Sequence, residues 1–287
     1  MHRLTCVFSI ALLSHTWAAN DPVLTDIGYK SGAELTEYEQ SRCKLDVYLP
    51  KTGKGFATLV WFHGGGLKQG DKAGTKVDTV LTPEIARSLT AAGIAVVAPN
   101  YRLSPKVTFP AYLQDGAAAV AWTQKHIAEH GGDPQRIFIG GHSAGGYIAL
   151  MLGVDARYLA EAGVKHADIA GVIPVSGQTL THYTVREERG GTKFHLTADD
   201  AAPLHYCGPN TPPFLVLYAD HDMAARGEEN MLFVEMMKAA GNKGMRSQLI
   251  KDRTHGSIAS KIAEEGDSAR IAILEFIAAQ AERREIK

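Results

Sequence analysis

The sequence predicts one α/β domain built on a mostly parallel, doubly wound sheet with helices on both faces. Strand-like and helix-like segments take turns along most of the 287 residues, as in a chain that returns through a helix after each parallel strand. Several strand candidates are short, continuous apolar runs, which is the pattern of strands buried on both faces. No internal repeat and no Ser/Gly-rich linker divides the chain, so we expect a single domain.

The strands and helices are predicted in an alternating order. We expect strands at Cys43–Leu49, Ala57–Phe62, Ile94–Ala98, Arg136–Gly140, Ile169–Val175, Phe214–Tyr218 and Ser247–Ile250. We expect helices at Thr82–Ala92, Tyr112–His130, Tyr147–Leu152, Glu228–Ala240 and Ile258–Arg284, the last with a break near Gly266. The first of these helices begins at Thr82, which can cap it, followed by Pro83 in its first turn, and Gly93 ends it.

The composition is that of an ordinary globular protein, with 45% hydrophobic and 21% charged residues. The 30 Lys and Arg against 31 Asp and Glu leave a net charge of -1, so we expect no polybasic surface for nucleic acid or an anionic membrane. The 29 glycines and 12 prolines are dispersed rather than periodic, which excludes collagen-like and low-complexity classes.

Residues 1–18 are typical of a secretory signal peptide. A basic start at Met1–Arg3 precedes the mostly apolar stretch Leu4–Leu13, and Ala18 offers a small residue at a cleavage point. The alternative is a membrane anchor, but the stretch is well short of the roughly 20 apolar residues that span a bilayer. We therefore expect residues 19–287 to form the mature domain, exported to a periplasm or secreted.

Two cysteines, Cys43 and Cys207, remain after such a cleavage. Export to an oxidising compartment would permit them to pair, but spacing does not determine connectivity. A disulfide and two free thiols both stay open. Two cysteines alone do not form a cysteine-only zinc site, and we expect no metal.

One long irregular stretch, Ser176–Pro213, exceeds an ordinary connection between a strand and a helix. We expect it to form a small cap or substrate loop over the carboxyl edge of the sheet. Tyr183, Phe194, His205 and Tyr206 within it are candidates for lining a pocket, with ordinary packing as the alternative.

The pattern Gly141-x-Ser143-x-Gly145 follows one predicted strand and precedes a helix. Small residues at both flanks permit the sharp turn that exposes a nucleophilic Ser hydroxyl. The alternative is a glycine-rich turn with a helix-capping Ser, but the strand Arg136–Gly140 directly before it favours the nucleophile. The Lys-Ser/Thr pair that a phosphate-binding loop requires is missing.

A second glycine cluster, His63–Gly66, follows the predicted strand Ala57–Phe62. Backbone without side chains can turn its N–H groups toward a shared site, where a developing oxyanion needs donors. We expect Gly65 and Gly66 to donate there together with Ala144, the residue after the candidate nucleophile. A flexible turn is the alternative.

A Ser nucleophile needs a base, and the base needs an orienting acid. Asp222 and His255 follow the last two predicted strands. Their order with Ser143 along the chain, Ser, Asp, His, is the order used by hydrolases whose nucleophile lies on a sharp turn between a strand and a helix. Asp220 is the competing acid. His142 neighbours Ser143 on the turn, and we expect it to shape that turn.

Four segments together resemble the α/β-hydrolase superfamily. They are HGGG at His63–Gly66, NYRLSP at Asn100–Pro105, FPAYLQD at Phe109–Asp115 and GGDPQRIFIGGHSAGG at Gly131–Gly146. Within it, the chain is similar to carboxylesterases related to hormone-sensitive lipase and to secreted feruloyl/acetylxylan-type esterases. The resemblance covers roughly Leu45–Phe276.

The resemblance implies an α/β-hydrolase catalytic domain with a small cap insertion. It implies a serine carboxylesterase that hydrolyses short-acyl or aryl esters, including plant-cell-wall feruloyl or acetyl esters, free or polysaccharide-linked. Ser143, Asp222 and His255 would form the triad, Gly65, Gly66 and Ala144 the oxyanion hole, and no cofactor would be needed.

Three departures from the family pattern matter. His142 stands where relatives of hormone-sensitive lipase usually carry Asp, and the segment before the first predicted strand is short, which favours a smaller-capped branch that includes arylformamidase-like amide hydrolases. Ala219 replaces the Gly of the usual Gly-x-x-Asp acid loop, a pattern that still selects Asp222. An amide hydrolase and a non-catalytic binding protein on a hydrolase scaffold are the alternative functions.

Overall fold

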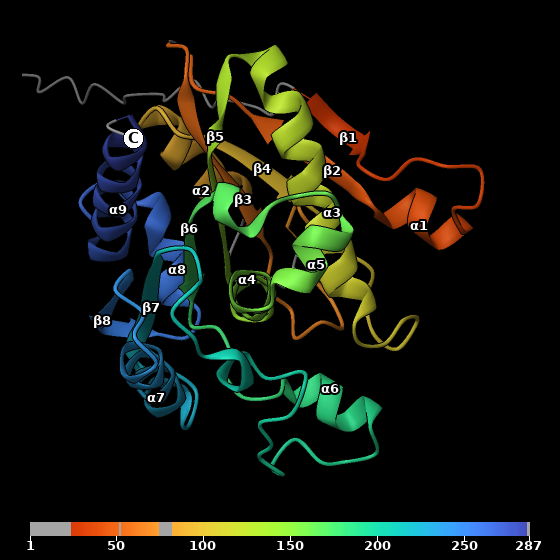
Figure 1. Ribbon diagram of the computed structural model, residues 1–287, viewed down its shortest axis with the longest axis vertical. Coiled ribbons are helices and arrows are strands. Elements are labelled where there is room, and N and C mark those ends of the chain that lie inside the picture. The colour runs from red at the N-terminus through yellow and green to blue at the C-terminus, as the bar shows by residue number, and fades with distance from the viewer. Residues whose placement is uncertain (1–23, 52, 75–81, 286–287) are drawn as a thin grey trace, which may run out of the picture.

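The computed structural model describes residues 24–51, 53–74 and 82–285. The predicted signal peptide, residues 1–18, lies outside these ranges. Eight strands form one sheet in the order β1-β2-β4-β3-β5-β6-β7-β8, and helices cover both of its faces (Figure 1). β2 pairs antiparallel with β1 and with β4, and the other neighbours are parallel. The predicted mostly parallel sheet with helices on both faces is confirmed.

The strands span β1 Leu24–Gly28, β2 Lys44–Tyr48, β3 Phe56–Phe62, β4 Ala95–Pro99, β5 Gly132–His142, β6 Ile169–Val175, β7 Phe214–His221 and β8 Met245–Thr254. The helices span α1 Glu37–Arg42, α2 Thr82–Ala91, α3 Ala111–His126, α4 Ala144–Val154, α5 Ala156–Glu161, α6 Tyr183–Glu188, α7 Arg226–Ala239, α8 Ser257–Ser260 and α9 Ser268–Glu285. Short 3-10 turns lie at η1 Ile127–His130, η2 His166–Asp168, η3 Pro203–Tyr206 and η4 Lys261–Ala263.

The two faces of the sheet carry separate hydrophobic cores. Side chains of α3, α4, α5 and α7 pack on one face, and those of α2, α8 and α9 on the other. The central strand β3 supplies both cores, because Val60 and Phe62 point to the first while Leu59 and Trp61 point to the second. This double burial explains why the strand is a continuous apolar run.

The sequence-based boundaries miss four elements. β1 is an edge strand whose side chains are all at least partly exposed, so it lacks a clear apolar alternation. α1 buries no side chain and is defined mainly by its capping box between Thr36 and Glu39. α5 and α6 have six residues each, too few to show a helical period. The predicted C-terminal helix is divided into α8, η4 and α9, and Gly266, with φ +86°, lies at the break.

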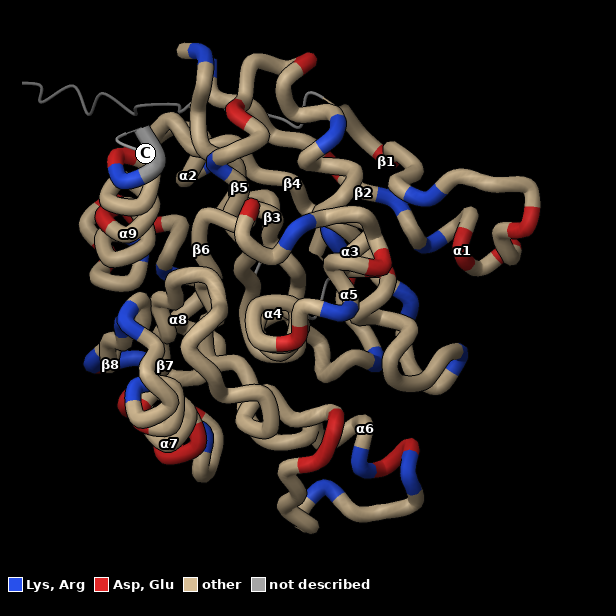
Figure 2. The backbone as a smooth tube through the Cα atoms, in the orientation of Figure 1, with Lys and Arg blue, Asp and Glu red and all other residues tan. Residues whose placement is uncertain are grey.

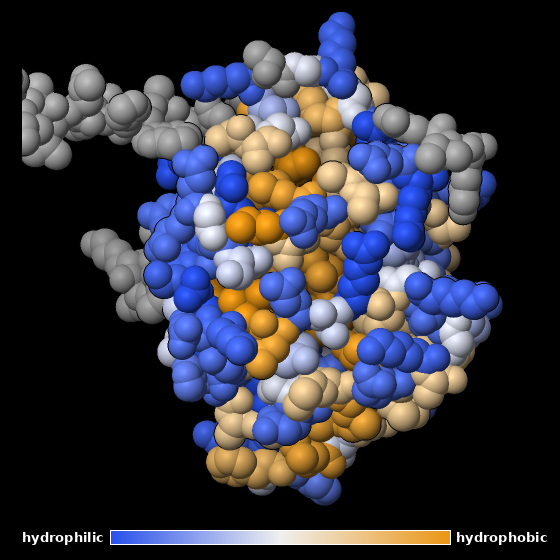
Figure 3. Space-filling view, turned by 90° about the vertical axis from the view of Figure 1, so that its left-hand side faces the viewer, coloured by the Kyte–Doolittle hydropathy of each residue, from blue (hydrophilic) through white to orange (hydrophobic). Residues whose placement is uncertain are grey.

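Charged residues of both signs lie over the periphery, including α6, α7 and α9 (Figure 2). The face that carries β8, turned toward the viewer in Figure 3, shows apolar side chains in a band between hydrophilic ones. Exposed large apolar side chains of α7, β8 and α9 are Met231, Leu232, Met236, Leu249 and Ile271. Within the described part of the chain, no helix has the length and apolar character needed to cross a membrane.

Cys43 and Cys207 are both free thiols in the structure, of which Cys43 is buried and Cys207 is half-buried. Burial raises the pKa of each thiol to about 11, so both are protonated at neutral pH.

The carboxyl ends of the parallel strands meet at one edge of the sheet. Phe62 at the end of β3 pairs in register with Gly141 of β5, and His221 at the end of β7 pairs with Thr254 of β8. The insertion between β6 and β7 leaves the same edge, and α6 lies at its far end, away from the sheet (Figure 1). The predicted site residues therefore converge on this edge.

Candidate active site

Ser143 occupies a sharp turn between β5 and α4. Its backbone has φ +55° and ψ -114°, a conformation that is strained for a residue with a Cβ. The neighbouring glycines are required, because a Cβ on Gly145 would lie 2.0 Å from the carbonyl oxygen of Phe62, and one on Gly141 would lie 2.6 Å from the same oxygen. The turn therefore presents the Ser143 hydroxyl at the carboxyl edge of the sheet.

A hydrogen-bonded chain joins Ser143 to His255 and Asp222. The Ser143 hydroxyl donates to His255 Nε2 at 2.9 Å, and His255 Nδ1–H donates to Asp222 Oδ1 at 2.6 Å. The side chain of Asp222 is 3% exposed, whereas that of His255 is 23% exposed and reachable from solvent. The structure thus brings together the three residues that the sequence predicts.

Of the two acids that the sequence left open, Asp222 contacts His255. Asp220 instead accepts hydrogen bonds from the backbone N–H groups of Asp252 and Arg253, at 2.8 and 3.0 Å. Burial opposes ionisation of Asp222, but hydrogen bonds from His255 and Ser176 outweigh it and lower the pKa of the carboxyl to about 2. Asp222 is therefore a carboxylate at neutral pH.

Ser176 is a contact of this site that the sequence analysis missed. Its hydroxyl donates to Asp222 Oδ2 at 2.5 Å, and its side chain is buried. Its backbone is held at φ +48°, with its carbonyl accepting from Arg226 Nη1 at 2.5 Å. Ser176 directly follows β6, so the rule that selected Asp222 and His255 at the ends of strands also applies to it.

His142 supports the other side of His255. Its Nε2–H donates to the backbone carbonyl of His255 at 2.7 Å, and the two rings lie 4.7 Å apart. Burial and the neighbouring His255 lower the pKa of His142 to about 3. A neutral His142 can thus hold the segment that carries His255 without adding a charge to the site.

The glycine loop after β3 lies against the turn that carries Ser143. A Cβ on Gly64 would be 3.5 Å from Ser143 Cβ. Gly65 and Gly66 have φ +108° and +63°, and the N–H groups of residues 68 and 69 both donate to the Gly65 carbonyl. Ala144 is the first residue of α4, so its N–H has no acceptor within that helix. The loop therefore meets the turn of Ser143 at Gly64, and Gly65 and Gly66 follow Gly64 in the same loop.

The loop is braced from the opposite side by residues that the sequence analysis did not select. Tyr101 donates its hydroxyl to the His63 carbonyl at 2.9 Å and stacks on the His63 ring at 4.4 Å. Arg42, at the end of α1, donates to the Gly70 carbonyl at 2.6 Å and forms an ion pair with Asp71. The missed helix α1 thus supports the glycine loop.

Of the four residues proposed to line a pocket, Tyr183 reaches the site, where its hydroxyl contacts Gly66. Tyr206 donates to the Asp200 carbonyl, and His205 packs against its ring edge to face. Phe194 is 80% exposed. For these three the structure supports ordinary packing or solvent exposure.

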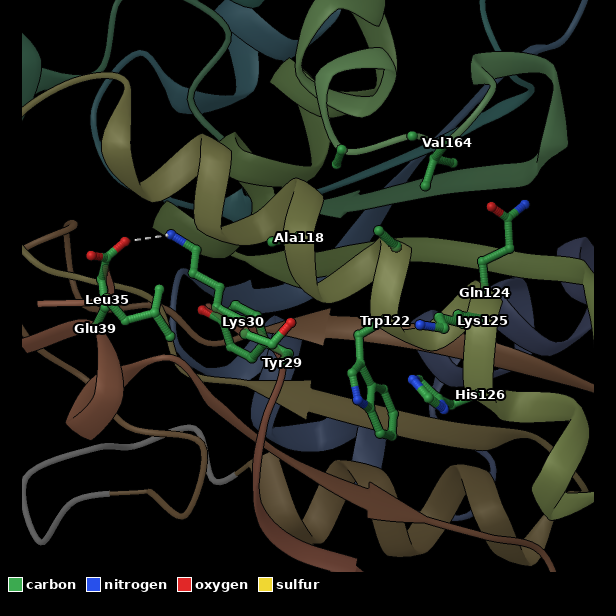
Figure 4. A pocket seen from close by; sticks show the side chains of 14 residues that line it. Tyr29, Lys30, Leu35, Glu39, Ala118, Trp122, Gln124, Lys125, His126 and Val164 are labelled. Carbon is green, nitrogen blue, oxygen red and sulfur yellow. Dashed lines mark hydrogen bonds and ion pairs between the residues drawn. The ribbon is translucent and has the colours of Figure 1, made fainter. Parts of the chain in front are cut away.

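A hollow of about 610 Å³ lies elsewhere, between the segment around α1, the helix α3 and the turn after α5 (Figure 4). Lys30, Glu39, Trp122 and His126 are among its lining residues, and none of Ser143, Asp222 and His255 is. Within the described ranges, Asp220, His221 and Asp252 are near enough to share a metal ion. All three are exposed, and Asp220 already accepts two backbone hydrogen bonds, so we assign them no site.

The strand order, the turn at Ser143 and the hydrogen-bonded chain to His255 and Asp222 place the protein in the α/β-hydrolase superfamily. The family model described as BD-FAE matches residues 45–237. The chain belongs to the BD-FAE family.

Curated relatives share part of this chain. It is 30% identical to the probable carboxylic ester hydrolase LipM of Mycobacterium tuberculosis over 199 residues. The aligned region covers 63% of this chain and 44% of LipM. It is 30% identical over 167 residues to esterase LipQ of the same organism, covering 52% of this chain and 39% of the relative. The chain thus spans about half the length, or less, of these relatives.

Solved structures share the fold over most of the chain. A truncated carbohydrate esterase from gut microbiota superposes with a TM-score of 0.71 at 19% identity, covering 90% of this chain and 96% of the other. Esterase 2 of Thermogutta terrifontis with bound propionate superposes with a TM-score of 0.65 at 22% identity, covering 90% and 92%. At these identities the similarity establishes the α/β-hydrolase fold.

Proposed function

We propose that the protein is a serine carboxylesterase that forms an acyl-enzyme on Ser143. The observation that carries this proposal is the hydrogen-bonded chain from Ser143 through His255 to Asp222. This hydrogen-bonded chain lies beside a glycine loop that approaches Ser143 at Gly64, and we propose that backbone N–H groups of this loop donate to an oxyanion. The names of the relatives, a probable carboxylic ester hydrolase and an esterase, support the same class of reaction.

Each step follows from the position of these groups. His255 Nε2 takes the Ser143 proton as the hydroxyl oxygen attacks the ester carbonyl, and Asp222 stabilises the imidazolium that results. The N–H groups of Gly65, Gly66 and Ala144 donate hydrogen bonds to the carbonyl oxygen and stabilise the negative charge that develops on it. His255 then gives the proton to the leaving alcohol as its bond to the carbonyl carbon breaks. In the second half, water loses a proton to His255 and attacks the acyl-enzyme, the bond to Ser143 Oγ breaks, and His255 returns the proton to Ser143 as the acid leaves.

The proposed substrates are short-acyl or aryl esters, including feruloyl or acetyl esters of plant cell walls. The solved carbohydrate esterase of the same fold supports a sugar-linked substrate. The signal-peptide pattern of residues 1–18 supports export, which would give the enzyme access to extracellular polysaccharide.

Hydrolysis of p-nitrophenyl esters from acetate to dodecanoate, with methyl ferulate and acetylated xylan, tests this proposal. We expect turnover that depends on Ser143 and is highest for acetate or ferulate. Turnover of a formanilide without turnover of any ester would instead indicate the arylformamidase-like alternative. No turnover of either class would favour a binding protein on a hydrolase scaffold.

Replacing Ser176 with alanine is expected to reduce kcat about tenfold, because Asp222 loses a hydrogen bond that fixes its carboxylate. That bond also lowers the pKa of Asp222, so its removal raises the pKa. Asp222 stays ionised at neutral pH in both enzymes, so the loss should appear in kcat at neutral pH, which steady-state kinetics measures. Thr179→Val is the control, because Thr179 bonds to the Glu229 carbonyl and not to Asp222. A kcat of Ser176→Ala equal to that of wild type would contradict this role.

Replacing Gly65 with alanine is expected to reduce kcat by about 10² or more, the usual effect of losing an oxyanion donor. The added Cβ would lie 2.1 Å from the Gln69 carbonyl oxygen, so the loop must move. Gly93→Ala is the matched control, because Gly93 also has positive φ but no atom within 4 Å of an added Cβ. Steady-state kinetics and thermal unfolding of both variants distinguish an effect of the displaced glycine loop from the general strain of a side chain at positive φ. A Gly65→Ala enzyme as active as Gly93→Ala would count against the assigned oxyanion hole.

A further inference from the structure

The Tyr183 hydroxyl points at the glycine loop. A Cβ on Gly66 would lie 1.9 Å from this hydroxyl and 3.0 Å from Tyr183 Cζ, so the phenol meets Gly66 end-on. The hydroxyl has no hydrogen-bond partner among the residues that the structure describes, and the side chain is only half-buried. A polar group is thus available beside the predicted oxyanion donor Gly66.

The Tyr183 ring is held in this orientation. It stacks on His182 with ring centres 4.5 Å apart, and His182 packs against Tyr147 of α4 at 5.0 Å. The backbone N–H of Tyr183 donates to Gln178 Oε1 at 3.1 Å. A hydrogen-bond donor that is already oriented needs little reorganisation when negative charge develops near it.

Two contacts made by residues that follow Tyr183 tie the insertion to the glycine loop. The Thr184 hydroxyl donates to the Gly66 carbonyl at 2.6 Å in a buried position. Lys68 and Glu187 form an ion pair of 2.6 Å. The distance between Tyr183 and Gly66 is therefore set by direct bonds between their two segments.

We propose that Tyr183 is a catalytic residue whose O–H donates to the ester carbonyl oxygen in the transition state. This inference rests on the proposed esterase function. In the proposed mechanism the Gly66 N–H donates to the ester carbonyl oxygen, so that atom is the substrate oxygen nearest to Tyr183. The phenol thereby adds a side-chain donor to the three backbone amides, and the insertion takes part in the chemistry.

Tyr183→Phe removes the O–H and keeps the ring. We expect kcat on p-nitrophenyl acetate to fall between about tenfold and 10²-fold, since removal of an oxyanion donor acts on charge that exists only in the transition state. KM should stay close to its wild-type value. A merely structural role of Tyr183 would instead lower the thermal unfolding temperature or raise KM.

Tyr206→Phe is the matched control, because it removes a phenol hydroxyl from the same insertion that is bonded to Asp200 and Arg157. It should leave kcat and KM unchanged. Wild-type kinetics in Tyr183→Phe, or a change in KM alone, would overturn the proposal while leaving the esterase function intact. An inactive wild type would overturn the esterase function and the role of Tyr183 with it.

Discussion

Replacing Ser143 with alanine is expected to lower kcat/KM on p-nitrophenyl acetate by a factor of roughly 10⁴ to 10⁶, the scale found when a nucleophilic serine is removed. No other group in the hydrogen-bonded chain can form the acyl-enzyme. His255 and Asp222 would remain in place but would have no hydroxyl to activate. Steady-state kinetics with enzyme free of contaminating esterases measures the effect.

The fold should tolerate this change. The backbone N–H of Ser143 donates to the Val175 carbonyl, and its own carbonyl accepts from Tyr147, so the bonds of the turn do not involve the removed hydroxyl. The thermal unfolding temperature should stay close to that of wild type. The exposed Ser41→Ala provides a control for handling and purity. A Ser143→Ala enzyme with a tenth or more of the activity would contradict the assigned nucleophile.

Replacing Asp222 with asparagine is expected to lower kcat by a factor on the order of 10⁴, the scale known for this change in a triad. The carboxylate accepts the Nδ1–H of His255 and thereby leaves Nε2 free to take the Ser143 proton. An amide NH₂ in that place favours the opposite tautomer, with the proton on Nε2. The loss should therefore appear in kcat with a well-folded protein.

Asp220→Asn is the matched control, since the two acids are two residues apart and the sequence alone left both open. Its carboxylate accepts two backbone N–H groups near the end of β8, and an amide oxygen can still accept one of them. We expect nearly full activity with at most a modest loss of stability. A larger kcat loss in Asp220→Asn than in Asp222→Asn would reverse the assignment of the acid.

The sequence predicted the central part of this site because parallel strands end at one edge. Ser143, Asp222 and His255 each follow a strand that periodicity or an apolar run identifies, so their convergence follows from the sheet itself. The sequence favoured Asp222 and kept Asp220 as the competitor, and the coordinates show that Asp222 meets His255 while Asp220 meets the backbone of β8. Backbone direction at that point is not encoded in a periodic pattern.

Sequence patterns did not identify the residues that support the glycine loop. Arg42 lies in α1, a polar helix without a buried side chain, and reaches the glycine loop only through the fold. Tyr183 was one of four aromatic or histidine candidates in the insertion, and the sequence offered no way to rank them. The bond from Thr184 to Gly66 joins residues 118 positions apart and depends on how the insertion returns over the sheet.

The most direct test of the account is covalent labelling by a p-nitrophenyl alkylphosphonate, whose product on a serine does not turn over. The account predicts release of one p-nitrophenolate per protein, activity lost in parallel, and a single modified peptide with the phosphonyl group on Ser143. His255→Ala should label far more slowly, because Ser143 then lacks its base. Full ester activity after labelling, or a phosphonyl group on another residue, would contradict the assignment of Ser143 as the nucleophile.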